Sequence, residues 1–310
     1  MAVTLVLRAL GLGDLLTAVP ALRALRAGRP DDRIVLAAPG SMAELAVWTG
    51  TVDDVIDTPG LGGIRWKGGS PDLAVNLHGS GPESIVDVLA TGPARVLTHR
   101  HDKFPHLPGP VWDGSLHEVR RWCRLIEYGG FPTDPTDLAL SVPDIDQGGG
   151  EIIIHPGAAS AARRWPADRF ATLAAHLRRH RHPVAITGNA AERELAQNIA
   201  ENAGLPMSSI TAGDLSLGQL AQRVANARLV ICGDTGVAHL ATAVNTPSVL
   251  LFGPTAPQRW GPPAGDRRHR VLWHGRTGDP HADHADPGLL EISVAEVIEA
   301  ADSHLAIAHV

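Results

Sequence analysis

The sequence predicts an α/β protein made of two doubly wound domains. Short apolar segments rich in β-branched residues alternate with segments whose apolar residues recur at helical spacing. A stretch rich in Pro and Gly, residues 131–150, interrupts this alternation once, and we interpret it as a linker. The chain has 310 residues, a length that suits two domains of about 100–200 residues each. Strands that alternate with helices are typical of a parallel sheet covered by helices on both faces.

The first half begins with a strand at residues 3–7, a loop punctuated by glycines at 8–13, and a helix with leucines at helical spacing from 15 to 25. Further strands are expected at 33–37, 54–57, 73–77 and 95–98, and helices at 41–48, 82–90 and 117–128. After the linker, a second strand and helix series is expected at 151–155, 170–178, 183–187, 192–203, 217–225, 229–232, 235–244 and 248–252.

The remaining C-terminal residues divide into a loop and a helix. Residues 261–288 are rich in Gly, Pro, His and Asp, which favours a loop, whereas residues 293–307 have helical spacing. We therefore expect an N-terminal domain at 1–145, a C-terminal domain at 151–290, and a final helix within 293–310.

Composition excludes several classes of protein. The 44% apolar content is too high for a disordered chain, and a net charge of −6 argues against a nucleic-acid partner. The two cysteines, Cys123 and Cys232, fit neither a disulfide framework nor a metal ligand pair, so we expect a protein of the reducing cytoplasm. No uninterrupted run of about 18 apolar residues exists. At most, peripheral membrane association is expected.

The first candidate site is Gly11-Leu12-Gly13-Asp14, which follows the first strand. The two glycines allow a sharp turn, and Asp14 at the start of a helix is placed to act as a general base. The alternative is an ordinary first-turn acid favoured by the helix dipole. A third glycine at dinucleotide-fingerprint spacing is missing, so the segment does not predict a dinucleotide site.

The second candidate site is Asp234-Thr235-Gly236, which follows an apolar strand and opens a helix, with His239 one turn further on. Helix N-terminal N–H groups attract phosphate, and a glycine there permits close approach of a ligand to the backbone. The alternatives are a simple helix cap, for the Asp-Thr-Gly segment, and a hydrogen-bonded, partly buried histidine for His239.

The third candidate site follows the strand at 151–155. The loop His155-Pro156-Gly157-Ala158-Ala159-Ser160 permits close backbone approach, and Arg163 and Arg164 can donate to phosphate. The alternative is an exposed loop with solvated arginines, beside a helix that begins near Pro166.

These motifs, taken in order, resemble glycosyltransferase family 9, the ADP-heptose:lipopolysaccharide heptosyltransferase family. The resemblance runs from residue 3 to about 263. It rests on Val6-Leu7-Arg8, Leu10-Gly11-Leu12-Gly13-Asp14, Pro20-Ala21-Leu22, His155-Pro156-Gly157, Arg164-Trp165-Pro166, Thr187-Gly188 with Glu192, Asp234-Thr235-Gly236, His239-Leu240-Ala241, Phe252-Gly253-Pro254-Thr255 and Trp260-Gly261-Pro262.

The resemblance implies a GT-B fold, two Rossmann-like domains facing across a cleft, with the final helix crossing back onto the N-terminal domain. It implies an inverting transfer, without a metal or other cofactor, from an ADP-linked heptose to an acceptor hydroxyl. Asp14 falls on the family's catalytic base. The donor-binding positions are Ser160, Arg163, Arg164, Thr187, Gly188, Asp234, Thr235, Gly236 and His239, and the acceptor side has Gly13, Asn76 and His78.

The chain departs from the family's pattern at several positions. Arg163 stands where lysine is usual, and it replaces a compact ammonium by a broad fork. Asn76 stands where many members have aspartate. In the tail, His281 and His284 replace a segment that contains cysteine in relatives; without a cysteine they do not predict a metal site.

Three readings of the function follow. The favoured one is a glycosyltransferase acting on a glycan, a glycolipid or a small-molecule secondary metabolite. The second is a non-hydrolysing nucleotide-sugar epimerase of the same fold, which the Gly-Asp segment after the first strand disfavours. The third is a catalytically silent protein that binds a nucleotide sugar; Asp14 argues against it, while the changes at Arg163 and Asn76 leave it open.

Overall fold

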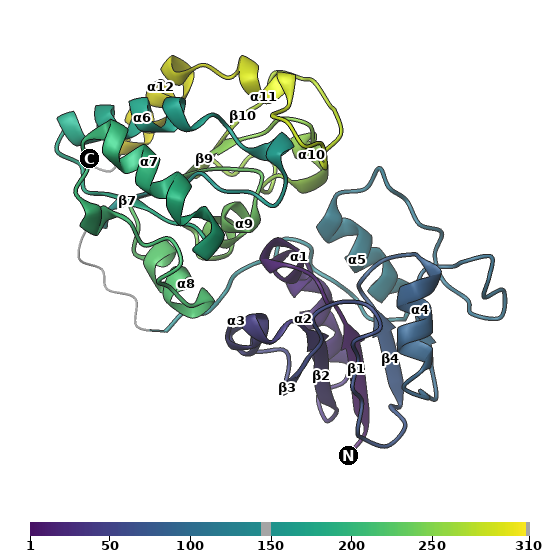
Figure 1. Cartoon of the computed structure of the whole chain (residues 1–310). Coiled ribbons are helices and arrows are strands. Elements are labelled where there is room, and N and C mark those ends of the chain that lie inside the picture. The colour runs from purple at the N-terminus through teal and green to yellow at the C-terminus, as the bar shows by residue number, and fades with distance from the viewer. Residues whose placement is uncertain (144–149, 308–310) are drawn as a thin grey trace. The chain divides into compact units, whose positions relative to one another are not determined.

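The computed structural model describes residues 1–143 and 150–307. The chain divides into two compact units, Met1–Ser141 and Val142–Val310. The division falls inside the predicted linker, residues 131–150, of which 144–149 lie outside the described residues, as do 308–310 of the predicted final segment. Each unit contains a five-stranded sheet in which every strand pair is parallel, as the alternation of strands and helices predicted (Figure 1).

The first unit has the strand order β3-β2-β1-β4-β5. Its strands are β1 (Val3–Leu7), β2 (Arg33–Ala38), β3 (Asp54–Asp57), β4 (Leu73–Asn76) and β5 (Val96–Leu97). Its helices are α1 (Leu12–Thr17), α2 (Val19–Gly28), α3 (Ala43–Trp48), α4 (Pro82–Leu89) and α5 (Glu118–Tyr128), with a 3₁₀ turn at Gly40–Met42.

The second unit has the strand order β10-β9-β8-β6-β7. Its strands are β6 (Ile152–His155), β7 (Val184–Ile186), β8 (Leu229–Gly233), β9 (Ser248–Leu251) and β10 (His269–Leu272). Its helices are α6 (Ala167–Arg179), α7 (Arg193–Ala203), α8 (Leu217–Ala225), α9 (Gly236–Ala243), α10 (Pro257–Trp260), α11 (Pro287–Glu291) and α12 (Val294–Ile307), with 3₁₀ turns at Ala161–Arg163, Ala190–Glu192 and Met207–Ser209.

Each sheet has one point at which the direction of strand addition reverses. In the first unit the chain adds β2 and β3 on one side of β1 and then β4 on the other, so the reversal lies between β1 and β4. In the second unit it lies between β6 and β8. At such a point the loops after neighbouring strands diverge and leave a crevice for a ligand at the carboxyl ends. Asp14 and Asp234 follow β1 and β8, one at each reversal point.

Two local predictions need correction. The predicted helix with leucines from residue 15 to 25 is two helices, because α1 ends at Thr17 and α2 starts at Val19 with Pro20 in its first turn, a position that suits proline. The tail at 261–288, predicted as a loop, contains β10, which pairs with β9 through Val271 and its neighbours. Four residues are too short for their pattern to be separated from the polar sequence around them.

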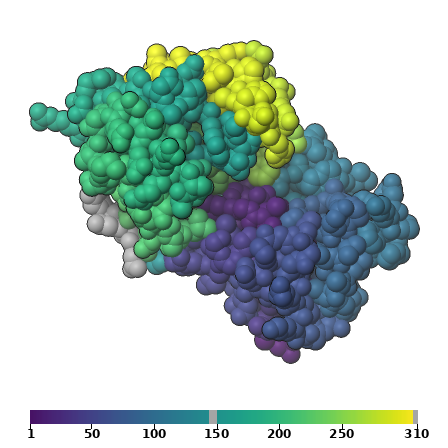
Figure 2. Space-filling model, in the orientation of Figure 1, coloured from purple at the N-terminus to yellow at the C-terminus, as the bar shows by residue number. Residues whose placement is uncertain are grey.

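The final helix contributes to the core of the second unit, and its expected packing on the N-terminal domain stays a prediction. The buried side chains of α12, Val297, Ala301 and Leu305, belong to the core of the second unit, together with residues of β6 and α6. In Figures 1 and 2 this C-terminal segment, coloured yellow, lies against the teal part of the second unit that contains α6. The apolar stripe of α12 is therefore used to complete the core of the second unit.

Candidate functional site

The structure describes two candidate sites, one in each unit. Asp14 lies in the first turn of α1, and 29% of its side chain is exposed. Gly11 caps this helix with an extended backbone (φ −80°, ψ −175°) that any residue adopts, so the expected sharp turn does not require it. A Cβ at Gly11 would lie 3.9 Å from Asp14 Oδ2. This is an ordinary van der Waals distance, so a side chain at position 11 would begin beside the carboxylate.

Arg8 holds Asp14 in place through contacts with its main chain and its carboxylate. Its guanidinium is 1% exposed and lies directly after β1. Nε donates to the main-chain oxygen of Asp14 (2.9 Å), and one terminal nitrogen lies 3.3 Å from both Asp14 Oδ1 and Thr17 Oγ1. The other terminal nitrogen donates to the Leu77 carbonyl, at the end of β4. Arg8 therefore connects the two strands that flank the reversal point.

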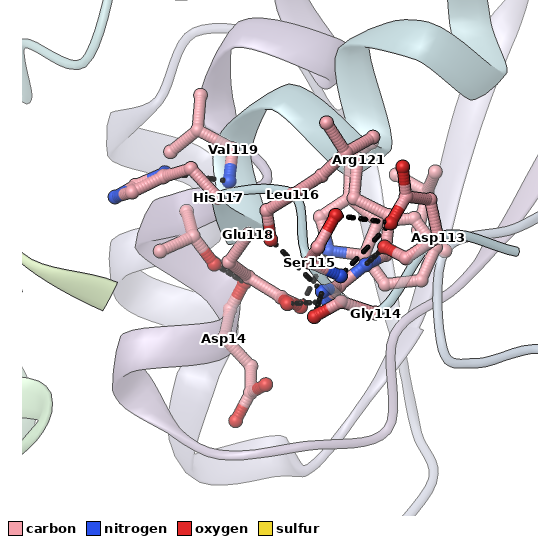
Figure 3. Close-up of polar contacts among 12 residues, drawn as sticks. Asp14, Asp113, Gly114, Ser115, Leu116, His117, Glu118, Val119 and Arg121 are labelled. Carbon is pink, nitrogen blue, oxygen red and sulfur yellow. Dashed lines mark hydrogen bonds and ion pairs between the residues drawn. The ribbon is translucent and has the colours of Figure 1, made fainter. Parts of the chain in front are cut away.

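A second carboxylate, Glu118, shares the Arg8 guanidinium. Glu118 opens α5, is 4% exposed, and accepts from Arg8 at 3.1 Å. Figure 3 shows Glu118 and Arg121, both in α5, in the same group of side chains as Asp14, and Arg121 donates to Glu118. Sequence reasoning missed Glu118, because a first-turn glutamate is common at helix starts for reasons of capping and dipole.

These surroundings set the protonation of Asp14. Burial raises the pKa of Asp14 above the ordinary value, the Arg8 charge lowers it, and the Glu118 charge raises it again; the net direction is upward. A carboxylate with a raised pKa is a stronger base, which is what abstraction of a hydroxyl proton requires.

The predicted acceptor-side residues Asn76 and His78 have different roles. Asn76 is fully buried, and its amide bonds to Gly79 O, Ser84 Oγ, Thr98 Oγ1 and the His78 N–H. In the structure the Asn76 amide therefore holds this loop, and its expected place on the acceptor side stays a prediction.

His78 carries the feature of a ligand-contacting residue. Its buried Nδ1 has no hydrogen-bond partner among the described residues. Burial, followed by the nearby Arg8 charge, lowers the pKa of His78, so a neutral imidazole follows β4. The third acceptor-side residue, Gly13, lies inside α1.

In the second unit, Asp234 follows β8 and Thr235 caps α9. The Thr235 hydroxyl accepts from the Val237 N–H at 3.2 Å, as an N-cap does. Asp234 is 5% exposed; burial raises its pKa, while the charge of Arg163 and a hydrogen bond from Thr255 lower it. Gly236 begins α9, so its N–H belongs to the helix N-terminus, where phosphate is favoured.

The predicted donor-site arginines are not equivalent. Arg163 lies at the end of a 3₁₀ turn, and one terminal nitrogen lies 3.3 Å from Asp234 O. Arg163 Nε is buried without a hydrogen-bond partner among the described residues, so a donor of this cation is unused. Arg164 is exposed and donates to Ala158 O. Ser160 donates to Ala282 O, so its hydroxyl fastens the tail.

The loops after β6 and β7 meet over a buried carboxylate. His155 Nδ1 lies 2.9 Å from Thr187 Oγ1, and burial lowers the pKa of His155 to about 4. Glu192 lies against both loop glycines: a Cβ at Gly157 would come within 2.0 Å of its carboxylate, and one at Gly188 within 3.1 Å of its Cβ. A Cβ at position 157 would require the Glu192 carboxylate to move, so the two loops and Glu192 pack closely together.

The remaining candidates lie apart from these contacts. His239, in α9, packs edge-on against Trp260 with ring centroids 5.7 Å apart. His281 and His284 are exposed in the tail. The part of the chain that the structure describes holds no group of three or more His, Cys, Asp or Glu side chains suited to a metal ion. Within the same residues, no helix is long and apolar enough to cross a membrane.

The raised pKa of Asp14 predicts a specific stability profile. A folded-state pKa above the unfolded value makes the carboxyl group favour folding below the unfolded pKa, and this contribution is lost as the pH rises through the folded pKa. Asp14→Asn should therefore raise the melting temperature at pH 7–8 and have little effect near pH 3. Calorimetry from pH 3 to pH 8 measures the melting temperature of Asp14→Asn, with the exposed change Asp31→Asn as the control. An equal shift of the melting temperature at both ends of this range would contradict the prediction.

Comparisons with known proteins agree with the geometry. The model of glycosyltransferase family 9 (heptosyltransferase) matches residues 115–285, more than half of the chain. The chain is 34% identical over 116 residues to lipooligosaccharide heptosyltransferase 2 of Haemophilus influenzae, covering 36% of this chain and 33% of that protein. It is 29% identical over 258 residues to lipopolysaccharide heptosyltransferase 3 of Escherichia coli, covering 76% and 75%.

The fold is similar over the full length of a solved structure. The structure of E. coli ADP-heptose lps heptosyltransferase II superimposes with a TM-score of 0.79 at 22% identity, covering 100% of both chains. The match to the first H. influenzae relative spans about a third of that protein's length. The family match includes β6 to β10 and the Asp234 segment and covers more than half of the chain, so the chain belongs to glycosyltransferase family 9 (heptosyltransferase).

Proposed function

We propose that this protein is an inverting, metal-independent glycosyltransferase that moves a heptose from an ADP-linked donor to a hydroxyl group of an acceptor. The observation that carries the proposal is Asp14: a carboxylate with a raised pKa, partly open to solvent, at the reversal point of the first sheet. Family membership favours this function over an epimerase or a silent binding protein.

In this proposal the second unit binds the donor. The diphosphate would be held by the N-terminal N–H groups of α9 and by the unused Nε of Arg163. The loops of His155, Thr187 and Gly188 would contact the nucleoside. ADP as the nucleotide is supported by the similarity of this fold to that of the E. coli ADP-heptose lps heptosyltransferase II.

The first unit would provide the base and the acceptor contacts. Asp14 takes the proton of the acceptor hydroxyl group while the oxygen of that hydroxyl bonds to the anomeric carbon. The attack comes from the side opposite ADP, so the configuration is inverted. The bond from the anomeric carbon to the phosphate oxygen breaks, and its electron pair leaves with ADP. Positive charge from Arg163 and the α9 N–H groups stabilises the diphosphate that departs. His78 would contact the acceptor through its free Nδ1.

The acceptor is proposed at the level of its class. The relatives carry names of lipopolysaccharide and lipooligosaccharide heptosyltransferases, which supports a glycan or glycolipid. A small-molecule acceptor differs in one testable respect, since its transfer would not require a lipid.

Removal of the proposed base should stop transfer but leave binding of the donor nucleotide intact. Asp14→Asn should lower the rate of transfer by about 10²–10⁴-fold, because a general base stabilises the transition state and does not contribute to binding of the donor. The affinity for ADP, measured by calorimetry, should stay within about twofold of wild type. Asp31→Asn is the control. A variant that keeps more than about a tenth of wild-type turnover would remove Asp14 from the mechanism.

The donor site should depend on Arg163. Arg163→Gln removes a charged donor and should weaken ADP binding by about 10–100-fold, the range expected for hydrogen bonds between charged groups. Arg163→Lys should recover part of the affinity, and Arg179→Gln, an exposed arginine of α6, should change nothing. Unaltered ADP affinity in Arg163→Gln would place the diphosphate elsewhere.

Activity should survive chelation. Because Arg163 and the helix N-terminus already neutralise the leaving diphosphate in the proposed site, excess EDTA should leave the transfer rate unchanged, as should the double variant His281→Ala, His284→Ala. Turnover that stops with EDTA and returns with Mg²⁺ or Mn²⁺ would show that a metal ion takes this role.

A further inference from the structure

Glu118 is a buried carboxylate that the proposed chemistry does not use directly. Both of its oxygens are occupied: Oε1 accepts from Arg8 (3.1 Å) and from Trp122 Nε1 (2.7 Å), and Oε2 accepts from Arg121. Burying a charged group costs free energy unless partners compensate for its lost hydration. A carboxylate so fully paired has a fixed position.

The same Arg8 nitrogen faces two carboxylates. It lies 3.1 Å from Glu118 Oε1 and 3.3 Å from Asp14 Oδ1. The guanidinium plane is held by the Leu77 carbonyl and by Trp122, whose ring centroid lies 4.6 Å from Arg8 Cζ. Arg8 cannot turn to form a bidentate pair with Asp14 without giving up these contacts.

The charges at this place alternate. In order of contact they are Asp14, Arg8, Glu118 and Arg121, and the Arg121 guanidinium also stacks over Trp112 at 4.4 Å. Two histidines lie near these charges. Burial, followed by the Arg8 charge, lowers the pKa of His78, from the loop after β4. Burial, followed by the Arg121 charge, lowers the pKa of His99 to about 4, although the Glu118 charge raises it. Glu118, which makes the shorter contact with Arg8, is therefore the main counter-charge of this guanidinium, and Asp14 is the second.

We infer that Glu118 is a positioning residue for the proposed base. It shares the Arg8 guanidinium with Asp14, so that Arg8 orients Asp14 but does not form a full ion pair with the Asp14 carboxylate. This inference rests on the proposed function, in which Asp14 accepts the proton. With Glu118 in place, Arg8 fixes the α1 backbone through the Asp14 carbonyl and makes only a long contact with the carboxylate. Without the charge of Glu118, Arg8 would pair with Asp14 alone and weaken it as a base.

The first test measures Asp14 directly, without substrate. Titration of ¹³C-labelled aspartate carboxyl groups by NMR, with Asp14 assigned through Asp14→Asn, reports its pKa in the whole protein. Glu118→Gln keeps the size of the side chain and removes the charge, and the pKa of Asp14 should fall by about one unit. Glu127→Gln, an exposed change on the same helix, is the control and should leave it unaltered.

The second test is the pH dependence of transfer. In Glu118→Gln the acidic limb of the kcat profile should move to lower pH by the same amount as the NMR titration. The plateau should fall about 3–10-fold because the base is weaker, while the KM for the donor is unchanged. A uniform loss of activity with no movement of the limb would show a merely structural role and overturn the inference.

If Asp14 responds to Glu118→Gln as expected but the wild-type protein transfers no sugar, the proposed function fails and the coupling of the two carboxylates stands.

Discussion

The buried guanidinium of Arg8 is the interaction on which the site of the first unit depends. A cation at 1% exposure requires compensation for its lost hydration, and the contacts that supply it come from three parts of the unit. The Leu77 carbonyl comes from the end of β4, Thr17 and Asp14 from α1, and Glu118 from α5. A single side chain therefore couples the sheet to the two helices at its carboxyl end, and the position of the base follows.

The second unit also buries charged groups, but fewer hydrogen bonds compensate for their lost hydration. Asp234 is 5% exposed, and Arg163 beside it keeps a buried Nε without a partner among the described residues. Unpaired buried donors are rare in folded proteins, since each costs free energy. Such a donor at the N-terminus of α9 has the properties of a group kept for an anionic ligand, whereas the fully paired Arg8 has those of a structural cation.

Both sites follow from the topology of a parallel sheet. Strands of such a sheet end at one edge, and the reversal point is where loops separate enough to leave room for a ligand. Residues after β1 and β4 gather at the first reversal point, and residues after β6 and β8 gather at the second. Burial then raises the pKa of both Asp14 and Asp234. The two carboxylates differ in access, because Asp14 keeps 29% of its side chain exposed.

The sequence by itself determined the α/β class, the two parallel sheets, and the Asp14 and Asp234 motifs, because these depend on local patterns: apolar runs, helical spacing and glycines at strand ends. It did not determine the packing of α12, since an apolar stripe shows that a helix is buried and not which core receives it. It missed β10, a four-residue edge strand whose identity comes from pairing with β9. It also missed Glu118, which meets Arg8 across 110 residues of chain, and it did not show that the Asn76 amide bonds to Ser84. Contacts between distant segments leave no periodic trace in the sequence, so only the tertiary structure decided them.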